Sequence, residues 1–115
     1  MQLALDEVHC WSLRLDVSQA ACDALFAILS HDERSRSARI RSPLLQRRFI
    51  AARGGLRELL GRYLEVHPGE LHFVHNEFGK PALSASFGSG FKFNLSHSDD
   101  LALIGIAAKI GRAHV

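Results

Sequence analysis

The stretch Phe91-Lys92-Phe93-Asn94-Leu95-Ser96-His97-Ser98 is the part of the sequence around which the rest is organised. Apolar and polar residues alternate along it, and a period of two predicts a strand with one buried face. The strand ends in Ser-His-Ser, whose hydroxyl and imidazole groups can donate hydrogen bonds to an anion or phosphate. The same residues are typical of a polar turn, in which Ser and Asp side chains bond their own backbone. The stretch alone therefore leaves an anion site and a turn both open.

The segments on either side predict a mixture of helices and strands. Residues 11–17 alternate like a strand, and Ser18 fits the N-cap of a following helix. Residues 30–33 form a capping-box pattern, which predicts a short basic helix up to about residue 41. Residues 71–75 and 101–107 read as further strands, the latter in a hairpin with the strand at 91–96. This order predicts an α+β fold, in which a small, mostly antiparallel sheet packs with two or three helices.

The longest predicted helix begins at Ser42-Pro43, with Ser as cap and Pro at the first helical position. Apolar residues from Leu45 to Tyr63 fall on one face of a helical wheel, so we expect one continuous core stripe with Phe49 at its centre. Gly54-Gly55 inside the helix costs on the order of 2 kcal/mol relative to two Ala. The pair indicates either a close approach of another element or a break in the helix.

Composition restricts the class of protein. The 115 residues suffice for one small domain, and a hydrophobic content of 47% provides for a core. No apolar run approaches the ~20 residues that cross a bilayer, and the N-terminus lacks a signal-peptide pattern. Cys10 and Cys22 do not have the spacing of a metal site. We therefore expect a cytoplasmic protein with reduced cysteines and no membrane partner.

Positive charge is concentrated in one block. From Arg34 to Arg57 there are eight Arg and no Asp or Glu, although the net charge of the chain is only +2. Such a block attracts phosphates or polyanions, or simply forms a solvated face. A nucleic-acid-binding module is therefore an alternative, but the aromatic residues that it would use for stacking fall on predicted core positions. On the long helix, three arginines are predicted to flank the apolar stripe: Arg48, Arg53 and Arg57. Two others, Arg47 and Arg62, are predicted to point to solvent.

Several short motifs follow one another in order: Leu29-Ser30-x-x-Glu33-x-x-Arg36, Arg48-Phe49, Arg53, Leu56-Arg57-x-Leu59-Leu60-Gly61-x-Tyr63, Gly79-Lys80-Pro81 and Phe93-Asn94-Leu95-Ser96-His97-Ser98. Each motif is weak alone. The ordered set, from about Trp11 to Ala107, resembles the N-terminal half of a 4'-phosphopantetheinyl transferase of the larger, surfactin-synthetase type. The resemblance implies one half of a two-half fold, with coenzyme A bound in the cleft between the halves. It implies transfer of 4'-phosphopantetheine from coenzyme A to a serine of an acyl, peptidyl or aryl carrier protein.

The resemblance also implies roles for individual residues. Ser96 and His97 would hold the 3'-phosphate of coenzyme A, and Arg53 would add a guanidinium to the same anion. Gly79, Lys80 and Pro81 would lie along the adenine and its phosphates, and Arg48 is a weaker candidate for the site. These roles agree with the chemistry of the side chains, because an imidazolium, a hydroxyl and a guanidinium form charge-assisted hydrogen bonds with a dianion. A Ser-His hydrolase is disfavoured, because adjacent strand residues point apart and no Gly-x-Ser-x-Gly motif is present.

No catalytic or metal-binding residue is expected in this chain. Members of the family hold Mg²⁺ through a Gly-Val-Asp-x-Glu motif and a Trp-x-x-Lys-Glu motif, and neither occurs here. We therefore expect residues 1–108 to be an N-terminal subdomain that lacks its C-terminal, metal-binding partner in cis and catalyses no transfer alone. Residues 109–115 are expected to be a non-native tail, because Ile110-Gly111-Arg112-Ala113-His114-Val115 matches one reading frame of a common sequencing adapter.

Overall fold

The computed structural model describes residues 3–4, 7–75, 77, 79–84 and 91–108. Its elements follow in the order β1 (Val8–Arg14), α1 (Gln19–Ala27), α2 (His31–Ala38), α3 (Pro43–Leu64), a 3₁₀ turn η1 (Pro68–Glu70), β2 (Phe73–His75), β3 (Pro81–Leu83), β4 (Phe91–Ser98) and β5 (Leu101–Ala108). The predicted α+β class is confirmed. The predicted non-native tail over residues 109–115 lies outside the described residues.

The strands form two antiparallel sheets rather than the single sheet that the sequence suggested. One sheet has three strands in the order β1-β5-β4, and the other consists of β2 and β3. The predicted hairpin joins β4 to β5, and Asp99 in its turn has a φ of 52°, a left-handed conformation that Asp tolerates better than most residues. The Asp100 carbonyl accepts a hydrogen bond of 2.8 Å from Leu15 N–H, which fixes the hairpin turn to the segment after β1.

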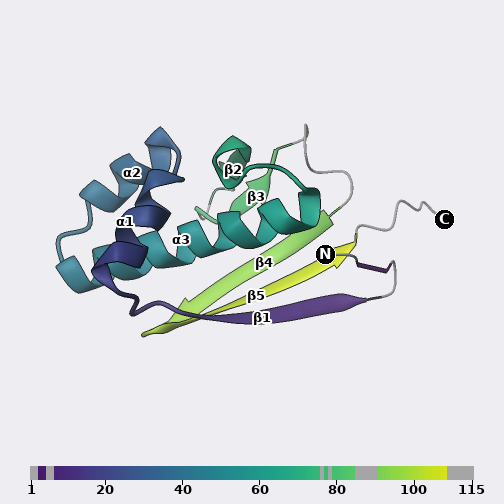
Figure 1. Ribbon diagram of the computed structural model, residues 1–115, viewed down its shortest axis with the longest axis horizontal. Helices are drawn as coiled ribbons and strands as arrows, with labels where there is room; N and C mark the ends of the chain where they lie inside the picture. Colours follow the sequence, from purple (N-terminus) through teal and green to yellow (C-terminus); the bar gives the residue numbers. More distant parts are fainter. Residues whose placement is uncertain (1–2, 5–6, 76, 78, 85–90, 109–115) are drawn as a thin grey trace.

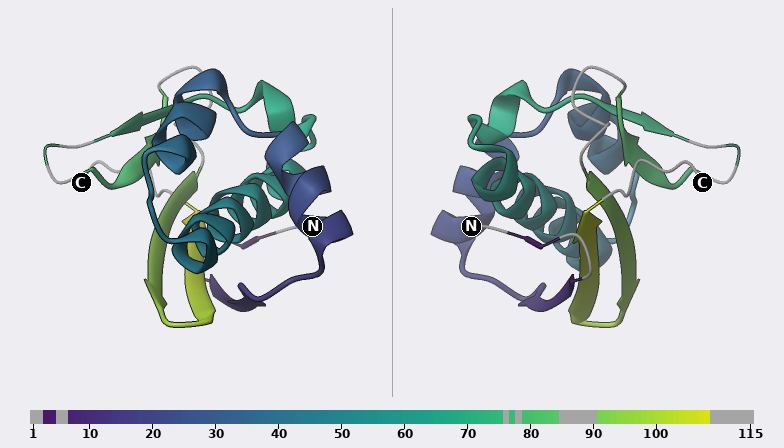
Figure 2. Two further views of the ribbon diagram at one scale, coloured as in Figure 1. Left: turned by 90° about the vertical axis from the view of Figure 1, so that its left-hand side faces the viewer. Right: turned by 90° about the vertical axis from the view of Figure 1, so that its right-hand side faces the viewer.

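Helix α3 crosses one face of the three-stranded sheet, and α1, α2 and the β2–β3 pair lie on the opposite side of α3 (Figures 1 and 2). The main core lies between the C-terminal half of α3 and the sheet. It contains buried residues from α3, the segment after η1 and β5: Leu56, Leu59, Leu60, Tyr63, Leu71, Ile104 and Ile106. β4 contributes Phe91, Phe93 and Leu95 to this core from its inward face, as its alternation predicts.

Local signals determine where the helices begin. Ser18, Ser30 and Ser42 are the N-caps of α1, α2 and α3, and each side chain accepts a hydrogen bond from a backbone N–H three residues later. All three caps were predicted. The capping box at the start of α2 is complete, because the Glu33 carboxylate also accepts the Ser30 backbone N–H at 2.9 Å.

Helix α3 corrects three expectations. Leu45 is 54% exposed and Phe49 is only half-buried, so the N-terminal part of the predicted stripe does not belong to the main core. The next position of the stripe, Ala52, is buried in a separate, smaller cluster with Leu15, Ala51 and Ala102. Arg47 does not point to solvent, because it donates 2.9 Å to the Val17 carbonyl and also bonds the Gln19 amide oxygen. Arg62 is exposed, as predicted.

The two glycines of α3 confirm that neighbouring elements approach closely there. A Cβ placed on Gly54 would stand 2.6 Å from Leu25 Cβ, and one on Gly55 would stand 2.6 Å from Leu13 Cδ1. Both distances are shorter than a normal contact between carbon atoms. The glycines therefore allow α1 and β1 to pack against α3 without interrupting the helix. Neither α3 nor any other helix in the described part of the chain is long and apolar enough to cross a membrane.

Candidate functional site

A cavity of about 320 Å³ lies between α3 and the end of β4, and we call it the α3–β4 pocket. Three segments that are distant in sequence line it: Phe49, Ala52 and Arg53 of α3, Gly79, Lys80 and Pro81 at the start of β3, and Leu95, Ser96 and His97 of β4. Six of the seven site residues proposed from sequence line this pocket. The seventh, Arg48, does not, because its guanidinium pairs with the Asp16 carboxylate at 2.9 Å and 3.2 Å.

The end of β4 contributes side chains from both faces of the sheet. His97 stands opposite Ala102 in β5 and is in phase with Phe93 and Leu95, which face α3. Ser96 stands opposite Leu103, which is 54% exposed on the outer face. Ser96 and His97 are both exposed. Adjacent strand residues point apart, as expected, yet both residues border the pocket.

The segment before β3 approaches the pocket through its backbone. Gly79 has a φ of 80°, a left-handed conformation that glycine adopts without the steric cost of a Cβ. Lys80 is exposed next to it, and Pro81 opens β3 opposite His75 in β2. A backbone turn without a side chain, followed by a cation, is suited to lie along a flat or anionic group.

Arg53 is the buried cation of the pocket. Only 6% of its surface is exposed, and its guanidinium lies 5.2 Å above the centre of the Phe49 ring. One terminal nitrogen contacts Glu33 Oε2 at 3.5 Å and donates to His75 Nε2 at 3.2 Å. Burial lowers the pKa of Arg53, and the nearby Glu33 opposes that shift. Within the described residues its Nε–H and its other terminal nitrogen have no hydrogen-bond partner, so donors remain for a ligand.

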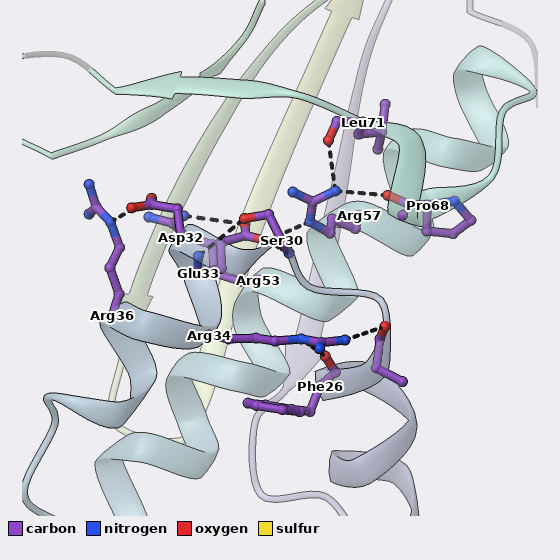
Figure 3. Close-up of polar contacts among 12 residues, drawn as sticks. Phe26, Ser30, Asp32, Glu33, Arg34, Arg36, Arg53, Arg57, Pro68 and Leu71 are labelled. Carbon is purple, nitrogen blue, oxygen red and sulfur yellow. Dashed lines mark hydrogen bonds and ion pairs between the residues drawn. The ribbon is translucent and has the colours of Figure 1, made fainter.

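Behind the pocket, Glu33, Arg53 and Arg57 form a buried group of charges that we call the Glu33 cluster (Figure 3). Arg57 and Glu33 are each 1% exposed, and Arg57 Nε donates 2.6 Å to Glu33 Oε1. Arg57 also donates 2.9 Å to each of the carbonyls of Pro68 and Leu71. From the sequence, Glu33 was expected in a capping box and Arg57 at the border of the apolar stripe, and both stand in the family motifs. No sequence pattern indicated that the two side chains form a pair.

The basic block is not a free cationic face. Besides the arginines already described, Arg36 pairs with Asp32 at 3.1 Å, and Arg34 donates to the Ala27 carbonyl at 2.8 Å. The bond from Arg48 is also what most strongly lowers the pKa of the Asp16 carboxyl. Most of the eight arginines are therefore used to join α2 and α3 to their neighbours. This disfavours the nucleic-acid-binding alternative, which needs several arginines facing outward.

The residues that the structure describes do not fit a metal ion. They contain no group of three or more His, Cys, Asp or Glu side chains placed to hold one. Asp99 and Asp100, the acidic residues near the end of β4, are exposed in the hairpin turn, where their charges act on Arg48. We therefore derive no chemical step that involves a metal bound to these residues.

Comparison with known proteins places the chain in a family. It is 46% identical to the 4'-phosphopantetheinyl transferase HetI of Nostoc sp. over 107 residues. This match covers 92% of the chain. The chain belongs to the 4'-phosphopantetheinyl transferase superfamily. It is also 36% identical over 83 residues to slr0495 of Synechocystis sp., a protein provisionally named a 4'-phosphopantetheinyl transferase. No protein-family model matches the chain.

Two solved structures share the fold of this chain. A holo-(acyl-carrier-protein) synthase from Bacillus anthracis, in complex with CoA (3',5'-ADP), superposes with a TM-score of 0.68 at 19% identity, covering 88% of this chain and 93% of that one. The holo-[acyl-carrier-protein] synthase of Neisseria meningitidis gives 0.54 at 17% identity, covering 89% and 96%. By contrast, the chain spans only 45% of HetI and 34% of slr0495, about half or less of the relatives that it matches.

Proposed function

We propose that this chain binds coenzyme A as the nucleotide-binding half of a 4'-phosphopantetheinyl transferase of the surfactin-synthetase type. The complete enzyme would transfer 4'-phosphopantetheine from coenzyme A to a serine of a carrier protein. The superfamily relationship and the coenzyme A complex of the Bacillus anthracis neighbour support this proposal. The cytoplasmic location expected from the two free cysteines, Cys10 and Cys22, is part of it.

The observation that carries the proposal is the state of Arg53. A guanidinium this buried costs free energy unless its donors are satisfied, yet part of Arg53 has no partner among the described residues. It lines the same pocket as His97 and Ser96. A phosphate in this pocket would accept hydrogen bonds from all three groups.

Each lining segment then has a distinct task in binding. Arg53, His97 and Ser96 would hold the 3'-phosphate of coenzyme A, whose two negative charges match their donors. The Gly79 backbone, Lys80 and Pro81 would lie along the adenine and its phosphates. The chain would thus bind and orient the donor substrate. In the complete enzyme a divalent cation would neutralise the pyrophosphate charge during transfer.

The test is a comparison of two ligands that differ in one phosphate. Arg53→Ala and His97→Ala each remove one charge-assisted hydrogen bond, so each should weaken coenzyme A binding by about ten-fold or more. Dephospho-coenzyme A, which lacks the 3'-phosphate, should bind all three proteins similarly. NMR titration of the 115-residue chain measures such affinities even when they are weak.

Two controls make the result specific. Arg62→Ala removes an exposed arginine of α3 outside the pocket and should leave the affinity for coenzyme A unchanged within about two-fold. Single-stranded DNA should not displace coenzyme A, as judged from the NMR signals of the residues that line the pocket. Equal losses for both ligands in the Arg53 and His97 variants, or displacement by DNA, would overturn the proposed site.

A further inference from the structure

Glu33 uses its two carboxylate oxygens for different purposes. Oε1 accepts the backbone N–H of Ser30 at 2.9 Å and the Nε–H of Arg57 at 2.6 Å. Oε2 lies 3.5 Å from a terminal nitrogen of Arg53. A buried carboxylate is tolerated only when such donors surround it. One side chain therefore joins the start of α2 to two successive arginines on α3 (Figure 3).

The two arginines of the Glu33 cluster differ in how far their donors are used. Arg57 makes three hydrogen bonds, to Glu33 and to the carbonyls of Pro68 and Leu71, and it lies 4.9 Å above the Phe73 ring. Among the residues that the structure describes, the hydrogen bonds of Arg53 come from one terminal nitrogen, which contacts Glu33 and His75. The guanidinium of Arg57 is thus held by several contacts. The guanidinium of Arg53 is held through one terminal nitrogen, and we assign its other donors to the α3–β4 pocket, which Arg53 lines.

The charges of the cluster do not balance. Two guanidinium groups share one carboxylate, and guanidinium groups stay protonated in proteins. His75 accepts a hydrogen bond from Arg53 and supplies no negative charge. The cluster therefore has an excess positive charge on the side of the α3–β4 pocket, where an anion would compensate it.

We propose that Glu33 is a positioning residue for phosphate binding, which holds Arg53 in the orientation that points its remaining donors into the α3–β4 pocket. The proposal rests on the proposed function of that pocket. Its physical basis is preorganisation: an arginine loses side-chain entropy on binding a ligand, and a contact that already restricts it reduces that loss. Glu33 acts through Arg53 and does not touch the ligand.

Glu33→Gln separates this role from capping. The amide oxygen of Gln can still accept from Ser30 and Arg57, since a capping box works with either residue. Its NH₂ group then replaces the oxygen that faced Arg53, and two donors repel each other. We expect the affinity for coenzyme A to fall about ten-fold, with little change for dephospho-coenzyme A. Glu58→Gln, the same change at an exposed site on α3, is the matched control and should bind both ligands like the wild type.

A double mutant distinguishes positioning from general damage to the fold. In the Arg53→Ala background, Glu33→Gln should weaken coenzyme A binding no further, because the group that it positions is already gone. A further loss in that background, or an undiminished preference of Glu33→Gln for coenzyme A over dephospho-coenzyme A, would overturn the positioning role. If Glu33→Gln does not fold, Glu33→Asp takes its place, because it keeps the charge but draws it away from Arg53, and the same outcomes apply.

The wild type separates this inference from the proposed function. If wild-type protein binds coenzyme A and dephospho-coenzyme A equally, the pocket is not a 3'-phosphate site and the proposed function fails. If wild type prefers coenzyme A and Glu33→Gln keeps the full preference, only the positioning role of Glu33 fails.

Discussion

The two halves of α3 present the same apolar stripe but have different surroundings. In residues 54–64, which we call the core half, the large side chains of Leu56, Leu59, Leu60 and Tyr63 are at most 7% exposed and fill the space above the sheet. In residues 43–53, the pocket half, the buried apolar positions are Ile50, Ala51 and Ala52. Of these, Ala52 lines the α3–β4 pocket, and its small side chain leaves space beside it. Side-chain volume along a stripe thus separates core from binding site, where hydrophobicity alone does not.

The largest effect should come from the core half. Leu60 is fully buried, so Leu60→Ala should lower the free energy of unfolding by about 2–5 kcal/mol through lost apolar burial and a residual cavity. Leu45→Ala, on the pocket half and more than half exposed, should change it by less than about 0.5 kcal/mol. Urea unfolding of both variants measures the difference. Similar losses at the two sites would break the comparison.

The next effect concerns the start of the core half. An added Cβ at Gly54 meets the Cβ and, at 3.2 Å, the backbone Cα of Leu25, so Gly54→Ala should destabilise the protein by about 1–3 kcal/mol. At Gly55 the Cβ meets only the flexible end of Leu13. There the better helix propensity of Ala, about 1 kcal/mol, offsets the rearrangement. In thermal melts the midpoint temperature of Gly55→Ala should be clearly higher than that of Gly54→Ala. The reverse order would contradict the close backbone contact between Gly54 and Leu25.

Phe49→Ala tests whether the pocket half serves binding rather than stability. The sequence placed Phe49 at the centre of the core, where its loss would cost about 3–5 kcal/mol. Because Phe49 is half-buried and borders the α3–β4 pocket, we now expect a loss nearer 1 kcal/mol. Removing the ring beneath Arg53 should weaken coenzyme A binding about two- to five-fold. A stability loss as large as that of Leu60→Ala would return Phe49 to the core.

The smallest effect involves His75, which contacts the pocket half through Arg53. Burial, with the charges of Arg36 and Arg53, lowers the pKa of His75. The unfolded chain therefore gains this proton at a higher pH than the folded one. The resulting stability is present above about pH 6.5 and declines as the pH falls below that value. Unfolding free energies at pH 7.5 and 5.5 should differ less in His75→Gln than in wild type, with His31→Gln as the matched control. An unchanged difference in His75→Gln would exclude this linkage.

Sequence patterns predicted the features that depend on near neighbours. The caps at Ser18, Ser30 and Ser42 are set by residues three positions away, and the alternation of β4 sets which of its side chains face inward. The set of residues around the α3–β4 pocket came from the ordered family motifs. The resemblance to the family implies which distant residues lie together in the fold, whereas hydrophobic periodicity describes only residues that are close in the chain.

The misses involve partners that are distant in the chain. Glu33 stands 20 and 24 residues from Arg53 and Arg57, and a local capping pattern already accounted for it. Arg47 bonds the Val17 carbonyl 30 residues away, so a helical wheel could not find its partner. Leu45 and Phe49 share the face of the core residues, but the sequence does not show which side chains of other elements cover that face. In each case the contacts of the residue depend on how another helix or strand packs against it, which the local sequence does not show.

The burial of Glu33 has a consequence for how α2 opens. This helix has only eight residues, and isolated helices shorter than about 12 residues are marginal in water. Its first turn is tied through Glu33 to Arg57, so unwinding that turn would leave a buried guanidinium without its acceptor. The amides of α2 should therefore exchange their hydrogens in the same event as those of α3 around Arg57, as one cooperative unit. A short surface helix would then exchange as slowly as the core to which it is joined.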